Sequence, residues 1–362
     1  MKPVHDRVRL YHQARTAHLE RGLAGRQTTL LYESRRYDFD TALADQVDAR
    51  QVGALAAARL LWSSAVEVVE ITEPAYLPGV RRAFVALLTV RVKGLLRRGR
   101  RPVVATYAIG NSDPRREFTP HGVKQHLSSW LNWQLSRRTM RWVDRIAFGT
   151  PAAEDLYRFL YGVPRRRQEQ RLVPALPTPC TCDPTAQKVP GSVAYVGAFV
   201  ERKGLRLLVD AWPDVTQHVP HATLALVGKG PLLAVAQALA AHDPQVRTVE
   251  DPPRSDIHAV LSRASVLVLA SQPTPRWREQ VGLPIVEGLQ HGCTVVTTDE
   301  TGLAPWLRAQ GHTVIPGSSD AGTLAKHLIA AIRAPLPPAS VLSSLPRDDG
   351  RLVADEWLLR DR

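Results

Sequence analysis

The chain has 362 residues, 44% of them hydrophobic, and a formal net charge of +13 at pH 7. This length exceeds what one hydrophobic core usually supports, so we expect two domains. The longest apolar run, residues 83–96, is interrupted by Arg91 and Lys93, which excludes a membrane-spanning helix there. The first twenty residues are charged and have no apolar signal core, so we expect a cytoplasmic protein.

The excess positive charge is confined to the first half of the sequence. Residues 1–185 contain 30 lysines and arginines against 17 acidic residues, whereas residues 186–362 contain 17 of each. One interpretation is a set of solvated helix faces, and the other is a surface for an anionic partner. We rank an anionic membrane above nucleic acid as that partner, because aromatic residues do not interleave with the basic clusters. These clusters are Arg97, Arg98, Arg100 and Arg101, then Arg137, Arg138 and Arg141, then Arg165, Arg166 and Arg167.

The first half alternates between strand-like and helix-like segments. Strands are predicted at residues 28–33, 66–72, 103–107 and 145–149, and helices at residues 80–98, 121–141 and 151–161. Residues 7–11 run almost directly into a helix-like segment at 14–23, without a glycine-rich turn. We therefore expect a Rossmann-like N-terminal domain over residues 1–176.

Residues 177–190, PTPCTCDPTAQKVP, have no apolar period and are predicted to be a linker. The linker contains Cys180 and Cys182, and the third cysteine is Cys293. The Cys-Thr-Cys spacing resembles half of a metal site, but no partner pair or histidine cluster lies nearby in the sequence. We therefore expect free thiols and no metal.

The second half alternates more regularly. Strands are predicted at residues 193–197, 223–228, 246–250, 266–270, 294–298 and 312–316, and helices at 205–218, 232–241, 256–263, 284–291, 303–309 and 321–332. Such alternation requires a parallel sheet, and ligands bind beyond the carboxyl ends of its strands. We expect a second Rossmann-like domain over residues 191–335. The proline-rich run after Arg333 should break any helix, and a last short helix is expected at 352–359.

Two carboxylates, Glu279 and Glu287, flank a predicted helix start with seven residues between them. Pro284 suits the first turn of a helix, because its fixed φ matches the helix and its missing N–H is not needed there. Free N–H groups and the helix dipole at such a start attract a phosphate. Glu287, which we place in the first turn, is positioned to accept hydrogen bonds from a sugar diol. The stretch therefore predicts a nucleotide-sugar site.

The pattern of Glu279, Gly282, Pro284 and Glu287 resembles that of the retaining glycosyltransferases of family 4, part of the glycosyl transferases group 1. Three further segments agree with this family in the same order: YVGAFVERKG at 195–204, LVGKG at 226–230 and VLVLA at 266–270. The resemblance covers residues 192–333 well and the first half only in outline. It implies the GT-B fold, in which two Rossmann-like domains face each other across a cleft, and a C-terminal tail, here 336–362, that packs back on the first domain.

The resemblance also implies roles for individual residues. Lys203 and the helix start would hold the donor diphosphate, Glu279 the sugar hydroxyls and Glu287 the ribose, with Lys203 and Glu279 as the catalytic pair. Arg202 is a further phosphate candidate, because Ala198 stands where the family usually has an arginine. The remaining donor-binding candidates are Gly282, Leu283, Pro284 and Ile285 at the helix start and Gly228 and Gly230 in the turn under the nucleobase.

The predicted function is transfer of a sugar from a nucleoside-diphosphate sugar to an acceptor hydroxyl, with retention of configuration. The resemblance implies that a donor phosphate oxygen takes the acceptor's proton, so neither a protein nucleophile nor a metal is required. A lipid-linked acceptor or a peripheral membrane location would explain the basic first half, and a nucleic-acid acceptor is the alternative. A non-catalytic sugar-nucleotide-binding subunit is a third interpretation, motivated by Ala198. For Glu279, a surface ion pair with Arg276 or Arg278 remains an alternative role.

Overall fold

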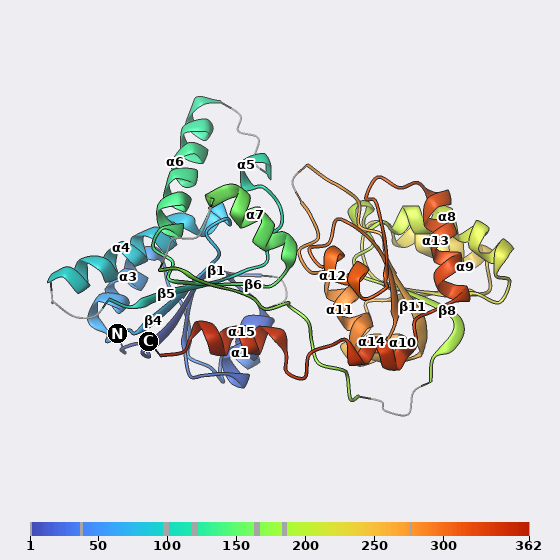
Figure 1. The fold of residues 1–362 in the computed structure, drawn as a ribbon, viewed down its shortest axis with the longest axis horizontal. Helices are drawn as coiled ribbons and strands as arrows, with labels where there is room; N and C mark the ends of the chain where they lie inside the picture. The colour runs from blue at the N-terminus through green and yellow to red at the C-terminus, as the bar shows by residue number, and fades with distance from the viewer. Residues whose placement is uncertain are drawn as a thin grey trace. The chain divides into compact units, whose positions relative to one another are not determined.

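The computed structural model describes residues 2–36, 39–96, 101–117, 122–162, 167–182, 187–275 and 277–361. The chain forms two compact units (Figure 1), one made of Met1–Pro174 with Gly350–Arg362 and the other of Ala175–Asp349. We call them unit 1 and unit 2. Among the described residues, no helix is both long and apolar enough to cross a membrane.

Unit 1 is built on a parallel sheet with the strand order β3-β2-β1-β4-β5-β6-β7. Its strands are β1 Arg7–Ala14, β2 Thr29–Arg35, β3 Ala49–Gln51, β4 Val68–Ile71, β5 Val103–Ala108, β6 Arg145–Phe148 and β7 Glu169–Leu172. Its helices are α1 Thr16–Ala24, α2 Thr41–Ala44, α3 Ala54–Ser63, α4 Val80–Leu96, α5 Pro114–Glu117, α6 Val123–Met140, α7 Pro151–Tyr161 and α15 Gly350–Leu358, with a 3₁₀ turn at Leu77–Gly79. Only Arg15 separates β1 from α1, so the expected absence of a glycine-rich turn is confirmed.

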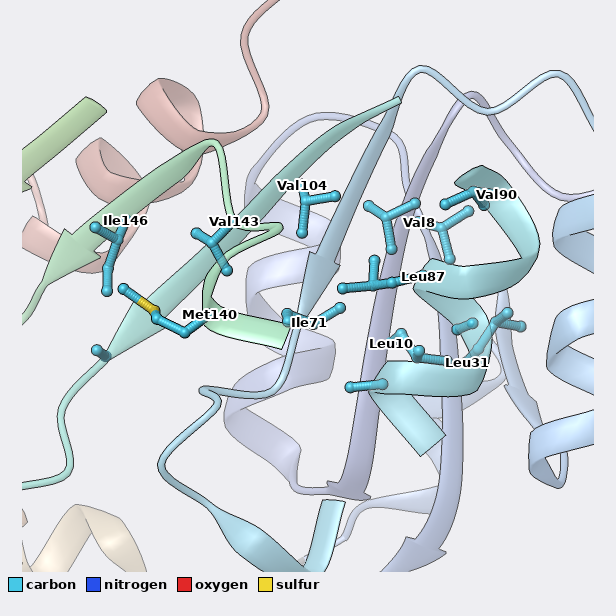
Figure 2. Close-up of a cluster of buried hydrophobic side chains, with 14 of the residues drawn as sticks. Val8, Leu10, Leu31, Ile71, Leu87, Val90, Val104, Met140, Val143 and Ile146 are labelled. Carbon is cyan, nitrogen blue, oxygen red and sulfur yellow. The ribbon is translucent and has the colours of Figure 1, made fainter. Parts of the chain in front are cut away.

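The core of unit 1 lies between the sheet and the helices on one of its faces. Figure 2 shows Leu87 and Val90 of α4 packed against Val8 and Leu10 of β1 and Ile71 of β4, all of them buried. Every residue of β4, β5 and β6 is buried. Strands buried on both faces are typical of a parallel sheet that helices cover on both sides.

The C-terminal helix α15 is held in unit 1 by buried ion pairs. Asp355 accepts hydrogen bonds from Arg9 Nη2 of β1 at 2.6 Å and from Arg21 Nε of α1 at 2.8 Å. Glu70 of β4 balances the second positive charge, with its Oε2 3.2 Å from Arg9 Nε. In Figure 1, α1 and α15 lie on the face of the sheet opposite α4 and α6. Arg145 of β6 extends this anchor, because its guanidinium donates to the carbonyl of the last residue of α15, Leu358, and to those of residues 360 and 361 just past it.

Unit 2 is built on a second parallel sheet, with the strand order β10-β9-β8-β11-β12-β13. Its strands are β8 Val189–Val196, β9 Thr223–Gly228, β10 Val246–Glu250, β11 Ala264–Leu269, β12 Thr294–Thr298 and β13 Thr313–Ile315. Its helices are α8 Leu205–His218, α9 Leu233–His242, α10 Arg254–Arg263, α11 Leu283–Gln290, α12 Ala304–Ala309, α13 Ala321–Arg333 and α14 Pro338–Ser343, with a 3₁₀ turn at Glu201–Lys203. The order reverses between β8 and β11, which is where open α/β sheets bind ligands.

The two Rossmann-like sheets predicted from the sequence are confirmed. The prediction that the proline-rich run breaks any helix is wrong, because α14 forms there with Pro338 as its first residue. Proline is compatible with a helix's first position, where its missing N–H leaves no bond unmade. Residues 175–182 pack within unit 2, and Cys180 N donates to Gln290 O at the end of α11, 2.9 Å away.

Candidate active site

The candidate site lies at the two loops that follow β8 and β11. The loop after β8 ends at Gly204, whose φ is +73° and whose Cα faces the end of β11. A Cβ at this position would lie 1.9 Å from the carbonyl oxygen of Ala270, so only glycine fits. A backbone bond of 2.9 Å from Gln272 N to Arg202 O joins the two loops a second time.

This contact brings Lys203 and Glu279 together. The Lys203 ammonium donates to Glu279 Oε2, and the two side chains are only 12% and 10% exposed. Ser271 Oγ donates to the same carboxylate oxygen at 3.3 Å. Two residues that the sequence analysis assigned to the catalytic pair thus form one largely buried ion pair at the switch point of the sheet.

Arg278, one of the two arginines considered as an ion-pair partner of Glu279, is engaged elsewhere. Arg278 Nε instead contacts Glu300 Oε2 at 2.9 Å, and its Nη2 donates to Asp299 O at 3.1 Å. The second candidate, Arg276, lies outside the described residues. Gly302 N donates to Glu279 O at 3.1 Å, so the loop after β12 braces the backbone that carries Glu279.

Trp277 places an aromatic face beside the two cations of the loop after β8. The Arg202 guanidinium lies 4.2 Å from the centre of the Trp277 ring, and Lys203 Nζ lies 5.2 Å from it. Such cation–π contacts restrain the cations without neutralising them. The sequence favours a packing role for Trp277, with a place in the lining of the sugar pocket as the alternative.

Gly282 and the start of α11 come next along the loop. Gly282 is the N-cap residue with φ +82°, Leu283 is the first helical residue and is exposed, and Pro284 is the second. The amide of Ile285 already donates to Gly282 O at 2.9 Å. This corrects the expectation that all four positions present free amides, since Pro284 has no N–H either. Within the part of the chain that the structure describes, no acceptor is found for the amides of Gly282 and Leu283.

Glu287 is the fifth residue of α11, so the expectation that it lies in the first turn is wrong. The helix begins at Leu283, one residue before the proline that the sequence suggested as its start. Burial raises the pKa of the Glu287 carboxyl above its ordinary value, and Arg254 of α10 opposes this effect. A half-buried carboxylate of this kind gains from a hydrogen-bonding partner.

Gly228 and Gly230 are required by packing of the loops after β8 and β9. Their φ angles are +151° and +150°, and a Cβ on them would lie 1.9 Å from Gly197 O and 2.6 Å from Phe199 O. Phe199 N donates to Lys229 O at 2.8 Å between these contacts. The two glycines therefore keep the loops against each other beside β8.

In unit 1, a carboxylate that the sequence analysis missed follows β4. Glu73 Oε2 accepts hydrogen bonds from Gly110 N, after β5, at 3.1 Å and from Tyr157 OH of α7 at 3.3 Å. Burial raises the pKa of the Tyr157 hydroxyl, and the Glu73 charge adds to this effect. The signal available in the sequence was an acidic residue placed directly after a predicted strand.

Residues 190–334 match the family model described as Glycosyl transferases group 1. No curated protein sequence matches the chain. Among solved structures, Alr3699/HepE from Anabaena in complex with UDP has a TM-score of 0.65 and 13% identity, over 97% of this chain and 95% of that one.

Two proteins of lipopolysaccharide synthesis are similar as well. The outer core galactosyltransferase WaaB has a TM-score of 0.67 and 11% identity, over 97% of this chain and 98% of its own. The glycosyltransferase WaaG has a TM-score of 0.55 and 14% identity, over 98% and 96%. These likenesses show that the two α/β units have the GT-B fold. With the matched segment, the fold supports a transferase enzyme that moves glycosyl groups.

Proposed function

We propose that the protein is a retaining glycosyltransferase of family 4 that takes its sugar from a nucleoside-diphosphate donor. The observation that carries the proposal is the Lys203–Glu279 ion pair beside the start of α11, at the switch point of unit 2. Alr3699/HepE has been solved with UDP-glucose, which supports a nucleotide sugar as the donor class. We leave the base, the sugar and the acceptor open.

Departure of the diphosphate is the step that most needs help from the protein. Lys203 and the amides of Gly282 and Leu283 supply positive potential where negative charge develops on the leaving group. A donor phosphate would compete with Glu279 for Lys203, which frees the carboxylate to accept hydrogen bonds from sugar hydroxyls. Arg202, adjacent to Lys203 and held over Trp277, is the candidate for the second cation, in place of the arginine that the family usually has where this chain has Ala198.

Retention follows if the acceptor hydroxyl attacks from the face that the diphosphate leaves. The hydroxyl's oxygen then bonds to the anomeric carbon as the bond from that carbon to the phosphate oxygen breaks. The acceptor's proton passes to the departing phosphate. This route needs no protein nucleophile, which agrees with the assignment of Glu279 to sugar binding.

Glu287→Ala is expected to weaken binding of a nucleoside diphosphate by roughly 1.5–3 kcal/mol, the range for a hydrogen bond to a charged group. Titration calorimetry on the folded variant measures this directly. Glu201→Ala is the matched control, because Glu201 is an exposed acid beside the site that pairs with Arg206. Unchanged affinity in Glu287→Ala would remove Glu287 from the site.

Turnover is expected to proceed without an added divalent metal, because protein groups supply the positive charge at the leaving diphosphate. No Asp-x-Asp sequence occurs from residue 186 onward. Initial rates with a nucleotide sugar should be equal with magnesium, with manganese and during a brief exposure to EDTA. Loss of activity that manganese restores would contradict this expectation.

Unit 1 also carries two exposed apolar stripes beside basic residues, which supports the proposed contact with a membrane. On α6 the spacing i, i+4, i+7, i+8 is filled by Val123, Leu127, Trp130 and Leu131, and on α4 by Leu88, Val92, Leu95 and Leu96. Arg137 and Arg138 on α6 are exposed as well. Apolar stripes flanked by basic side chains are typical of helices that lie in an anionic membrane interface. Arg97, Arg98, Arg100, Arg165 and Arg166 lie outside the described residues.

The protein is therefore expected to float with anionic liposomes at low salt and to be released at high salt, since exposed charges are screened within a Debye length. Leu127→Glu should reduce flotation, because it places a charge in the apolar stripe of α6. Leu55→Glu is the control, because Leu55, on α3 of the same unit, is 73% exposed against 63% for Leu127. Flotation that ignores lipid charge would contradict the proposal, and a steep salt-dependent shift on DNA would favour the nucleic-acid acceptor instead.

Hydrolysis of the donor in the absence of an acceptor distinguishes a glycosyltransferase from a non-catalytic binding subunit. A retaining transferase releases sugar slowly to water when no acceptor is present, whereas a binding subunit leaves the nucleotide sugar intact. Lys203 and Glu279 form the ion pair described above, which favours the enzyme.

A further inference from the structure

Four side chains that bind metals meet at the C-terminal end of α11, away from the start that faces the proposed donor site. Cys180 and Cys182 come from the segment before β8, His258 from α10, and His291 caps α11. The sequence analysis found no histidines near these cysteines, because His258 lies 76 residues beyond Cys182. Only the fold brings the four together.

The distances within the cluster are close to those of a coordination sphere. The four ligand atoms lie within 4.8 Å of one another. His258 Nδ1 lies 3.8 Å from Cys180 Sγ, 4.0 Å from Cys182 Sγ and 2.8 Å from His291 Nε2. Around a tetrahedral zinc ion, with Zn–S about 2.3 Å and Zn–N about 2.0 Å, ligand atoms are separated by roughly 3.3–3.8 Å. Changes of up to about 1 Å in these separations would complete that geometry.

The backbone around the cysteines already holds them in place. Cys180 N donates to Gln290 O at 2.9 Å, and Gln290 Nε2 donates back to Thr178 O at 3.2 Å. Cys182 N lies 3.4 Å from Cys180 Sγ and donates to it, which favours a thiolate at that sulfur. The two cysteines are separated by only one residue, fewer than in most zinc motifs. The hydrogen bond from Cys182 N to Cys180 Sγ is compatible with this short spacing.

Each imidazole offers the cluster one ring nitrogen, Nδ1 of His258 and Nε2 of His291. None of the three cysteines forms a disulfide.

We propose that Cys180, Cys182, His258 and His291 bind one divalent cation of the zinc class in a closed, structural site. Two thiolates and two imidazoles are the soft donor set that selects zinc, and four protein ligands leave no position for substrate. The ion would join the first segment of unit 2 to α10 and α11. This proposal is independent of the glycosyl-transfer chemistry, since no step of that reaction uses the ion.

The test is the metal content of the full-length, untagged protein, purified with a thiol reductant from zinc-supplemented cells. We expect about one zinc per chain by mass spectrometry, as for a closed four-ligand site. Replacing zinc by cobalt should produce thiolate-to-cobalt charge-transfer absorption. Cys182→Ser should lose the zinc and the absorption, and because its side chain is exposed, the variant is expected to fold.

Two control variants keep the result specific. Cys293→Ala removes a buried thiol whose Sγ lies 3.2 Å from Ala264 O, outside the cluster, and His242→Ala removes an exposed histidine at the end of α9. Both should retain zinc. Prolonged chelation should lower the melting temperature of the wild type and not that of Cys182→Ser.

The proposal is overturned if the wild type carries no zinc and shows no cobalt absorption, or if Cys182→Ser binds as much zinc as the wild type. A disulfide between Cys180 and Cys182 in the reduced preparation would also overturn it. Zinc loss and failure of the proposed function are distinguishable, because nucleotide binding by calorimetry and zinc content are measured separately on the same protein.

Discussion

Lys203→Met is expected to lower kcat for glycosyl transfer by about 10²–10³, the loss seen when one preorganised donor to a developing oxyanion is removed. Lys203 is held by its largely buried ion pair with Glu279, in the loop that leads to α11. Methionine keeps the length of the side chain and removes the charge. Donor KM should change less than kcat, because the charge acts mainly on the departing diphosphate.

Lys229→Met is the matched control for this variant. Lys229 lies in the neighbouring loop, and its ion pair with Asp251 is exposed on both sides, with 65% and 60% of the side chains accessible. Its removal should leave kcat unchanged. If Lys203→Met retains wild-type kcat, the leaving-group role passes to Arg202 and the present assignment fails.

A second measurement on the same pair separates catalysis from folding. Lys203→Met leaves the Glu279 carboxylate largely buried without its cation, which destabilises the protein. Adding Glu279→Gln removes the orphaned charge, so the double variant should recover stability by chemical denaturation without recovering activity. Recovery of activity in the double variant would show that Lys203 serves only to neutralise Glu279.

The fold of unit 2 could be predicted closely because its signals are local. The predicted strands at 223–228, 246–250 and 294–298 coincide with β9, β10 and β12, and the helix at 205–218 coincides with α8. Apolar periodicity and flanking glycines fix such elements without knowledge of the rest of the chain. In unit 1 the edge strands β3 and β7 were missed, because ARQ and EQRL are short and polar and contain no buried residue.

The site was predictable as a set of residues and not as a set of contacts. Glycine spacing and the two acids pointed to Lys203, Glu279 and Glu287. The ion pair joins positions 76 residues apart, which no local pattern reveals. The register of α11 was wrong by one residue, and the amide of Ile285 proved to be engaged. Both errors have the same cause. The N-cap of α11 is Gly282, with positive φ, and the helix therefore begins at Leu283 and not at Pro284.

The net charge of a sequence is also an incomplete guide to where its charged side chains lie. The basic first half suggested solvated faces or an anionic partner, but Arg9, Arg21 and Arg145 are buried in unit 1. Arg9 and Arg21 pair with Glu70 of β4 and with Asp355 of the last helix, which lies 334 residues beyond Arg21. Arg145 pairs with Glu169 of β7. Net charge in a sequence therefore does not distinguish cations that face solvent from cations that hold a terminus in place.

Asp355→Ala is expected to lower the free energy of unfolding of unit 1 by about 3–5 kcal/mol, the cost of removing one partner of a buried ion pair. Arg9 is 1% exposed and Arg21 7%, so both guanidiniums would lose a counter-ion that water cannot replace. Glu70 would remain as the single acid between two cations.

The measurement is denaturant unfolding of the full chain, monitored by circular dichroism. The transition of each unit is fitted separately, because two units need not unfold together. Glu356→Ala, which removes an exposed acid next to Asp355 on α15, is the control and should have almost no effect. A loss below about 1 kcal/mol in Asp355→Ala, the scale of an exposed pair, would mean that α15 is not anchored through this ion pair.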